Sequence, residues 1–120
     1  MESDLNKDKV NSKRIHLLER MLNELMPKIY PVIRYIKIEG PEKQMRGWIT
    51  FLNYEINVYT TIPEGITKED YWISEYRDMD FSWMAHHHVD EMLKYLSLNP
   101  SDFFREVFVY NINDELIGEF

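Results

Sequence analysis

Three consecutive histidines, His86, His87 and His88, are the residues whose types most directly suggest chemistry. On a helix, His86 would lie one turn from Asp90 and His87 one turn from Glu91, and either pair could offer two ligands to a divalent metal ion. Successive helical residues point about 100° apart, so three adjacent histidines cannot share one ion. A zinc site needs three or four converging ligands. The pattern therefore favours a polar helix face, with His88 against the core and no bound metal.

Adjacent carboxylates are the other groups that could do chemistry, because general acid–base catalysis often uses two of them. With 21 acidic residues among 120, such pairs arise without a catalytic role. The chain has no Gly-x-Ser-x-Gly motif, no glycine-rich phosphate loop and no cysteine. We therefore expect no catalytic residues and no cofactor, and the protein is predicted not to be an enzyme. The pairs are Glu69/Asp70, Asp78/Asp80, Asp90/Glu91 and Asp114/Glu115.

Charge is distributed unevenly along the chain. Residues 1–50 carry ten basic and seven acidic side chains, whereas residues 51–120 carry four basic and fourteen acidic ones. A surface of one sign attracts partners of the opposite sign. The acidic second part disfavours nucleic acid and anionic membranes as direct ligands, and it favours a basic protein.

The segment from Glu69 to Asp90 interleaves aromatic and acidic residues, with Arg77 as its single basic residue. Its aromatic residues fall at too many phases of a helix to face inward together. Exposed aromatic residues among charges are typical of protein–protein hot spots. The alternative is that Trp72, Phe81 and Trp83 belong to the core, with the carboxylates as a solvated rim. The predicted partner-binding residues are Glu69, Asp70, Tyr71, Trp72, Glu75, Tyr76, Asp78, Asp80, Trp83 and Asp90.

The first element predicted to support this segment is an amphipathic helix. It begins near Ser12 and ends near Met26, because Pro27 lacks the N–H that a helix interior needs. Its apolar stripe has spacings of three and four residues, and comprises Ile15, Leu18, Leu22, Leu25 and Ile29, with Met21 and Met26 beside them.

Residues rich in β-branched side chains predict the strands. One strand covers residues 32–39 and ends in a turn at residues 40–43. Residues 48–62 form two strands joined at Asn53, and in the second of them Ile56, Val58 and Thr60 share one face.

Two helices and two strands complete the pattern. Thr67 and Asp70 resemble a capping box, so a short helix should begin at Lys68, and a longer helix covers residues 82–96. Strands over residues 105–111 and 116–120 flank a hairpin turn at Asn113 and Asp114. The order α-β-β-β-α-α-β-β predicts an α+β fold with about five mainly antiparallel strands packed by helices.

The chain length corresponds to one domain, which we expect over residues 12–120 after a flexible N-terminal tail of residues 1–11. No signal peptide and no run of about 20 apolar residues are recognisable. The expected location is the cytoplasm.

The order of these elements resembles the YezG-like immunity proteins, antitoxins of Gram-positive bacteria that neutralise secreted nuclease toxins. The resemblance covers residues 15–120 and depends on short patterns. It implies a non-catalytic, acidic bacterial inhibitor that binds one toxin and blocks its active site. The patterns are Leu22-Asn23-Glu24-Leu25-Met26-Pro27 before a strand with Tyr30 and Tyr35, Asn57-Val58-Tyr59-Thr60-Thr61-Ile62-Pro63, and a closing hairpin from Val107 to Phe120. The family's tryptophan before the penultimate strand is replaced here by Phe103-Phe104.

Three other functions remain open from the sequence. A phage-encoded inhibitor of a host nuclease would use the same acidic segment. A small metal-binding protein or enzyme would use His86 to Glu91. An oligomeric accessory domain would pair strand edges at residues 48–62 or at the C-terminal hairpin. The sequence does not distinguish a monomer from an oligomer.

Overall fold

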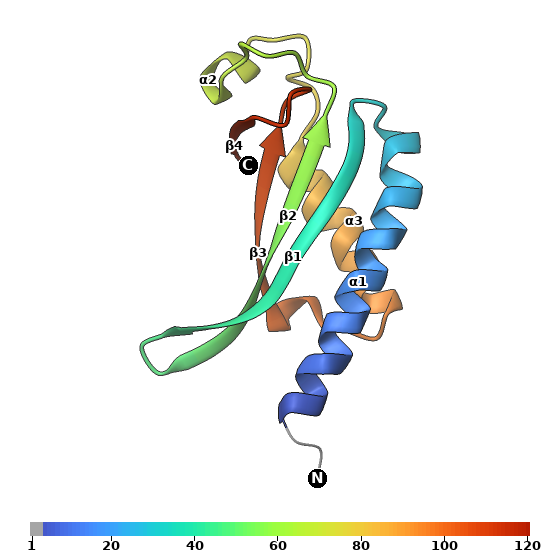
Figure 1. The fold of residues 1–120 in the computed structure, drawn as a ribbon, viewed down its shortest axis with the longest axis vertical. Coiled ribbons are helices and arrows are strands. Elements are labelled where there is room, and N and C mark those ends of the chain that lie inside the picture. The colour runs from blue at the N-terminus through green and yellow to red at the C-terminus, as the bar shows by residue number, and fades with distance from the viewer. Residues whose placement is uncertain (1–3) are drawn as a thin grey trace.

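In the computed structural model, which describes residues 4–120 with side chains from Lys13 onward, two helices cover one face of a four-stranded sheet (Figure 1). The strands are β1 (Ile33–Arg46), β2 (Ile49–Thr60), β3 (Phe103–Tyr110) and β4 (Leu116–Glu119), adjacent in that order. The helices are α1 (Asp4–Ile29), α2 (Lys68–Tyr71) and α3 (Phe81–Tyr95), with a 3₁₀ turn, η1, at Pro100–Asp102. The predicted α+β class is confirmed, with four strands instead of about five.

Helix α1 is longer at both ends than its sequence pattern predicts. Residues 4–11, expected to form a flexible tail, are its first turns, while residues 1–3 lie outside the described chain. The helix also continues past Pro27 to Ile29, because a proline in the last turn removes only one hydrogen bond of the ladder. The buried stripe is Ile15, Leu18, Leu22 and Met26, whereas Leu25 and Ile29 are largely exposed.

Strands β1 and β2 form one long antiparallel hairpin where the sequence suggested three strands. The predicted turn at residues 40–43 is an irregularity inside β1, between Glu39 and Glu42, after which the pairing resumes. The predicted break at Asn53 is wrong, because its backbone pairs with both neighbouring strands. Its buried side-chain amide donates a hydrogen bond to Glu106 Oε1 (3.0 Å), so the polar side chain is satisfied inside the sheet.

The prediction of a mainly antiparallel sheet is confirmed, because β1 pairs with β2 and β3 with β4 in antiparallel fashion, whereas β3 lies parallel to β2. Parallel strands need a long crossover connection, which usually contains a helix. Here the connection between β2 and β3 contains α2 and α3, and α3 packs on one face of the sheet. The last pair, β3 and β4, is antiparallel, and Asp114 takes a positive φ of 61° in the predicted hairpin turn. Strand β2 therefore lies between β1 and β3, and both of its edges are paired from Leu52 to Tyr59, whereas Ile49 to Phe51 pair with β1 alone.

The core lies between the sheet and the two long helices. Ile56, Val58 and Thr60 on β2 face it, as their alternation predicts, together with Val107 and Val109 on β3. Helix α3 contributes Met84, Ala85, Val89, Met92 and Leu93, which are buried, whereas Tyr95 near its end is exposed.

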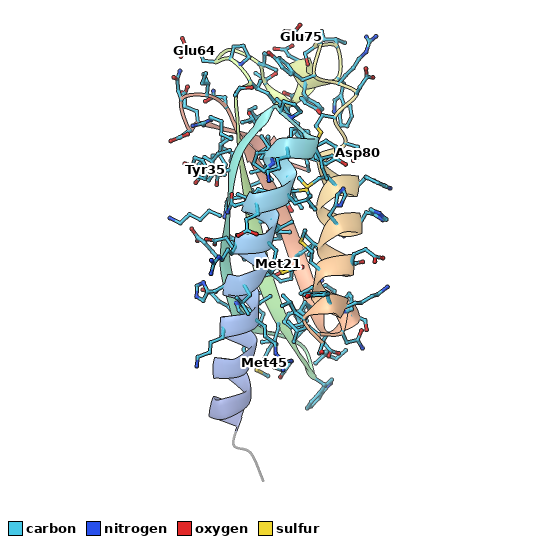
Figure 2. All side chains as sticks on the ribbon, turned by 90° about the vertical axis from the view of Figure 1, so that its right-hand side faces the viewer. Met21, Tyr35, Met45, Glu64, Glu75 and Asp80 are labelled. Atoms are coloured by element: carbon cyan, nitrogen blue, oxygen red, sulfur yellow. The ribbon has the colours of Figure 1, made fainter. Side chains whose placement is uncertain are left out.

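Helix α1 also covers the free edge of β1. Asn23 donates to the carbonyl of Ile36 and accepts from its N–H, both at 2.7 Å, and Glu19 Oε2 accepts from the N–H of Ile38 at 2.8 Å. These side chains satisfy backbone groups that an edge strand leaves open to another chain. No helix of the described residues 4–120 covers the opposite face of the sheet, and in Figure 2 Tyr35 points to the side away from α3.

Candidate protein-binding surface

The segment that joins the sheet to α3 presents large apolar side chains to solvent. Trp72 is 57% exposed, Ile73 79% and Trp83 53%. Five carboxylates in the same stretch are exposed as well, and α2 with its following loop occupies one end of the molecule (Figure 1). The side chains of Glu75 and Asp80 lie at that end in Figure 2. We define the acidic–aromatic surface as the exposed residues Glu69, Asp70, Trp72, Ile73, Glu75, Asp78, Asp80 and Trp83.

A buried aromatic cluster anchors this surface to the core. The rings of Tyr71 and Phe81, both buried, contact Phe120 at the end of the chain, with centroid distances of 5.1 and 5.7 Å. Tyr71 also packs edge-on against Trp72 (5.2 Å). Aromatic pairs at these distances stabilise beyond the area they bury. The exposed Trp72 is thus held against a fixed base.

Hydrogen bonds within the loop fix its course between α2 and α3. Ser74 Oγ donates to the carbonyl of Tyr71 (2.7 Å) and accepts from the N–H of Tyr76 (3.2 Å). The Tyr71 hydroxyl donates to the carbonyl of Met79. Burial, reinforced by the charges of Asp80 and Asp78, raises the pKa of Tyr71 to about 12, so the hydroxyl stays protonated and remains a donor at neutral pH.

Helix caps connect the loop to both helices. The Thr67 hydroxyl accepts from the N–H of Asp70 (3.2 Å), which confirms the predicted cap of α2. Asp80 Oδ1 accepts from the N–H of Trp83 (2.8 Å) and caps α3. Asp80 therefore has a structural role while remaining exposed.

Three of the predicted partner-binding residues do not belong to this surface. Tyr71 is fully buried and belongs to the core, and Tyr76 is only partly exposed. Asp90 lies farther along α3, where it forms an ion pair with Arg105 of β3. The other seven are exposed, and the structure adds Ile73, which the search for aromatic and acidic residues overlooked. The sequence signal for Ile73 was its position directly after Trp72, within the segment that interleaves aromatic and acidic residues.

The histidine triplet is engaged in packing along α3. His87 stacks on Trp83 (4.5 Å, 16° between planes), and His88 Nε2 lies 3.1 Å from the Tyr30 hydroxyl. Burial, with His87 adding, lowers the pKa of His88, and burial, with Arg105 adding, lowers that of His86. Among residues 13–120, whose side chains the structure describes, no group of three or more His, Cys, Asp or Glu side chains converges as a metal site would require.

The open face of the sheet holds residues that sequence reasoning missed. Tyr35, Tyr59 and Tyr110 form a stacked ladder across β1, β2 and β3, with centroid distances of 4.5 and 4.6 Å. The Tyr110 hydroxyl donates to the buried Asn57 Oδ1 (2.9 Å) on the neighbouring strand. The alternation in β2 placed Asn57 and Tyr59 on one face, but the partners on β1 and β3 depend on the sheet register.

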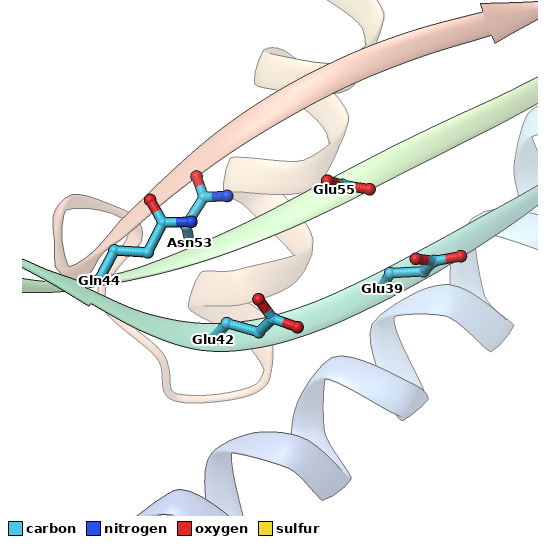
Figure 3. A pocket seen from close by; sticks show the side chains of 5 residues that line it. All are labelled: Glu39, Glu42, Gln44, Asn53 and Glu55. Carbon is cyan, nitrogen blue, oxygen red and sulfur yellow. The ribbon is translucent and has the colours of Figure 1, made fainter.

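Farther along this face, carboxylates surround a small hollow (Figure 3). Glu39, Glu42 and Glu55 line it together with Gln44 and Asn53. Burial, followed by the charges of Glu106, Glu39 and Glu42, raises the pKa of Glu55. The hollow is therefore a region of concentrated negative charge on the open face of the sheet.

No known family model, curated protein or solved structure matches the chain. The proposed function therefore depends on the exposed side chains of the acidic–aromatic surface. None of the helices in the described residues is long and apolar enough to cross a membrane.

Proposed function

We propose that this protein is a non-catalytic, acidic inhibitor that binds a basic protein through the acidic–aromatic surface. The observation that carries the proposal is the exposure of Trp72, Ile73 and Trp83 beside five exposed carboxylates. Tryptophan is enriched among residues whose truncation costs most in protein interfaces. Carboxylates around such anchors accelerate the capture of a basic partner.

Rigidity of the surface supports the same function. The buried ring cluster of Tyr71, Phe81 and Phe120 and the hydrogen bonds of Ser74 fix the loop before any partner binds. A fixed loop loses little conformational entropy on association, and this improves affinity without adding contacts. An element that only connected a sheet to a helix would not need two exposed tryptophans.

A nuclease toxin is the partner class that best fits this charge. Nucleases that bind the phosphate backbone present basic active sites, and a cluster of carboxylates can occupy such a site in place of phosphates. The proposed role is then that of a bacterial immunity protein or antitoxin in the cytoplasm, in line with the resemblance to the YezG-like proteins. A phage-encoded inhibitor of a host nuclease would use the same surface on a different target.

The test is inhibition and binding of a panel of basic bacterial nucleases, with the wild-type chain and surface variants. Trp72→Ala should weaken binding of the responsive nuclease by about 2 kcal/mol, or about 30-fold. The double variant Glu75→Lys and Asp78→Lys should reduce the association rate, with a larger effect at low ionic strength.

Glu91→Lys is the matched control, because Glu91 is exposed on α3 outside the acidic–aromatic surface. It should leave the association rate close to that of the wild type. If the surface variants bind and inhibit as well as Glu91→Lys does, the acidic–aromatic surface is not the interface. If no nuclease responds to the wild-type chain, the nuclease assignment fails.

A further inference from the structure

One edge of the sheet is uncovered along the first half of β3. Strand β4 pairs with residues 108–110 of β3, and the contact ends at Val107, whose carbonyl accepts from the N–H of Phe120 (2.8 Å). No strand of residues 4–120 pairs with residues 103–106 on this side, and Figure 1 shows β3 without a neighbour there. By contrast, side chains of α1 satisfy backbone groups on the opposite edge of the sheet.

The main chain of Arg105 faces this uncovered edge. Main-chain N–H and C=O groups of alternate residues in a strand point to the same edge, so those of Arg105 point the same way as the Val107 carbonyl. The Arg105 side chain is only 6% exposed, because it turns to Asp90, yet the residue as a whole is partly exposed. Its main chain therefore reaches solvent. Such N–H and C=O groups at a sheet edge are a template for another strand.

A groove borders this edge on the open face of the sheet, with a volume of about 400 Å³. Strand β3 contributes Phe104 and Arg105 to its lining, the β1–β2 hairpin contributes Ile49 and Phe51, and β4 contributes Glu119. The rings of Phe51 and Phe104 meet edge-on at a centroid distance of 4.7 Å, and Phe104 is 58% exposed. Apolar contacts beside unpaired main-chain groups are the combination by which a sheet edge recognises an extended peptide.

The charges around the groove favour a basic segment. Two carboxylates, Glu106 and Glu119, line the groove together with Arg46 and Arg105. The guanidinium of Arg105 is paired with Asp90 on the core side of the sheet, so Arg46 is the basic group left beside the two carboxylates. The glutamate hollow of Figure 3 adjoins the groove and shares lining residues with it. The surroundings are thus acidic and attract a partner of opposite sign.

We propose that the uncovered edge of β3 binds an extended basic segment of a partner protein, which joins the sheet as a further strand in line with β4. The main chain of the segment hydrogen-bonds to the N–H and C=O of Arg105, an apolar side chain packs on Phe104, and a lysine or arginine lies near Glu106 and Glu119. Main-chain hydrogen bonds supply the affinity of such a site, and the groove supplies its specificity. The site shares no residue with the acidic–aromatic surface, so it does not depend on the proposed function.

The probe is a synthetic hexapeptide that alternates lysine and valine, and the readout is amide NMR of the full chain. In the free protein, the Arg105 amide should exchange with deuterated water faster than that of Val109, which lies opposite Gly118 of β4. The peptide should shift the amides of Phe104, Arg105 and Glu106. At a concentration about ten times its dissociation constant, it should slow exchange of the Arg105 amide about tenfold.

Methylated peptides test whether the main chain carries the binding. One form is N-methylated at every valine and the other at every lysine, so both lose the same number of N–H groups. Alternate amides of a strand face opposite edges, so one form should lose binding and the other should keep it. Equal affinities of the two forms would overturn strand pairing. A hexapeptide that alternates glutamate and valine should bind at least about tenfold more weakly than the lysine form, because its charges repel those of the groove.

Two variants test the groove, each with a matched control. Phe104→Ala should raise the dissociation constant of the peptide about tenfold, whereas Trp72→Ala, at an aromatic residue equally exposed but outside the groove, should leave it unchanged. Glu119→Lys should raise it about fivefold, and Glu91→Lys should not. If Phe104→Ala disturbs the amide spectrum beyond the groove, Glu119→Lys and the methylated peptides still test the site.

Three results would overturn the proposal. The first is the absence of shifts at residues 104–106 with millimolar peptide. The second is a set of shifts confined to the amides around Trp72, which would assign the peptide to the acidic–aromatic surface. The third is protection of the Arg105 amide that rises with protein concentration without peptide, which would show that a second copy of the chain occupies the edge. Binding that one methylated form loses, and that Phe104→Ala and Glu119→Lys weaken, supports the added strand.

Discussion

Arg105 of β3 forms an ion pair with Asp90 of α3 across the layer between the sheet and the helix. The arginine side chain is only 6% exposed, whereas that of Asp90 is 39% exposed. Arg105 also donates to the carbonyl of Ala85 (3.2 Å), and its guanidinium lies 5.7 Å from the centre of the buried Tyr54 ring. One side chain thereby connects α3 to the middle of the sheet.

Asp90→Ala should lower the free energy of unfolding by about 2 kcal/mol, because it leaves the guanidinium of Arg105 nearly buried without its counter-charge. The partial exposure of Asp90 keeps the loss below that of a fully buried pair. Urea unfolding measures it, with Glu91→Ala as the control, which should stay within about 0.5 kcal/mol of wild type. The double variant Arg105→Met and Asp90→Leu should lose less than Asp90→Ala; a larger loss would mean that the arginine stabilises chiefly through α3 carbonyls.

Tyr54→Phe should raise the free energy of unfolding by about 1 kcal/mol. The Tyr54 side chain is fully buried, and its hydroxyl has no hydrogen-bond partner within the described part of the chain. Removing a buried polar group that lacks a partner relieves its desolvation cost. Tyr71→Phe is the matched control and should lose about 1 kcal/mol, because that hydroxyl donates to the carbonyl of Met79. Equal losses in the two variants would show that Tyr54 has a partner, such as a bound water.

Glu55→Gln should stabilise the protein at neutral pH and have little effect in acid. The folded-state pKa of Glu55 is raised, first by burial and then by Glu106, Glu39 and Glu42, so ionisation is harder in the folded than in the unfolded chain. The penalty is absent below the unfolded-state value of about 4.3, grows as the pH rises through the folded-state pKa, and is complete above it. Urea unfolding at pH 7 and below pH 4 checks the sign. Glu91→Gln should show no such difference, and a gain from Glu55→Gln that persists in acid would contradict an electrostatic origin.

Gly40→Ala should destabilise the protein more than Gly65→Ala, although both glycines have positive φ, at 103° and 91°. A Cβ on Gly40 would lie 2.9 Å from the carbonyl oxygen of Asn53, whereas one on Gly65 would meet nothing within 4 Å. Gly65→Ala should cost about 1–2 kcal/mol for the backbone conformation alone. Gly40→Ala should cost about 3 kcal/mol, because the clash is with backbone. Thermal unfolding compares the two, and equal costs would show that the strand shifts to make room.

Local signals predicted the local structure well. The alternation of Ile56, Val58 and Thr60 identified the buried face of β2, and the Thr67 hydroxyl caps α2 as its spacing to Asp70 indicates. The hairpin turn before β4 followed from Asn113 and Asp114. Each of these features depends on residues close in the chain, where propensity and capping act directly.

Features that depend on distant residues were not predicted. Asn53 resembled a break because its partner, Glu106, is supplied by another strand. Asp90 was assigned to the binding surface because its ion pair with Arg105 cannot be recognised before the register of α3 and β3 is known. The exposure of Trp72 and the burial of Phe81 were likewise undecided, since Phe120, which packs against both, lies far from them in the sequence.

The parallel pairing of β2 with β3 has a consequence for the order in which the chain folds. As the chain leaves the ribosome, α1, β1 and β2 are complete by residue 60, but the other edge of β2 finds its partner only when residues 103–110 emerge. Such non-local pairing is slow, because closing the long loop costs conformational entropy before the stabilising contacts between the strands form. The middle of the sheet is thus completed late, and a nascent chain that ends before Phe103 leaves one edge of β2 unpaired and open to aggregation.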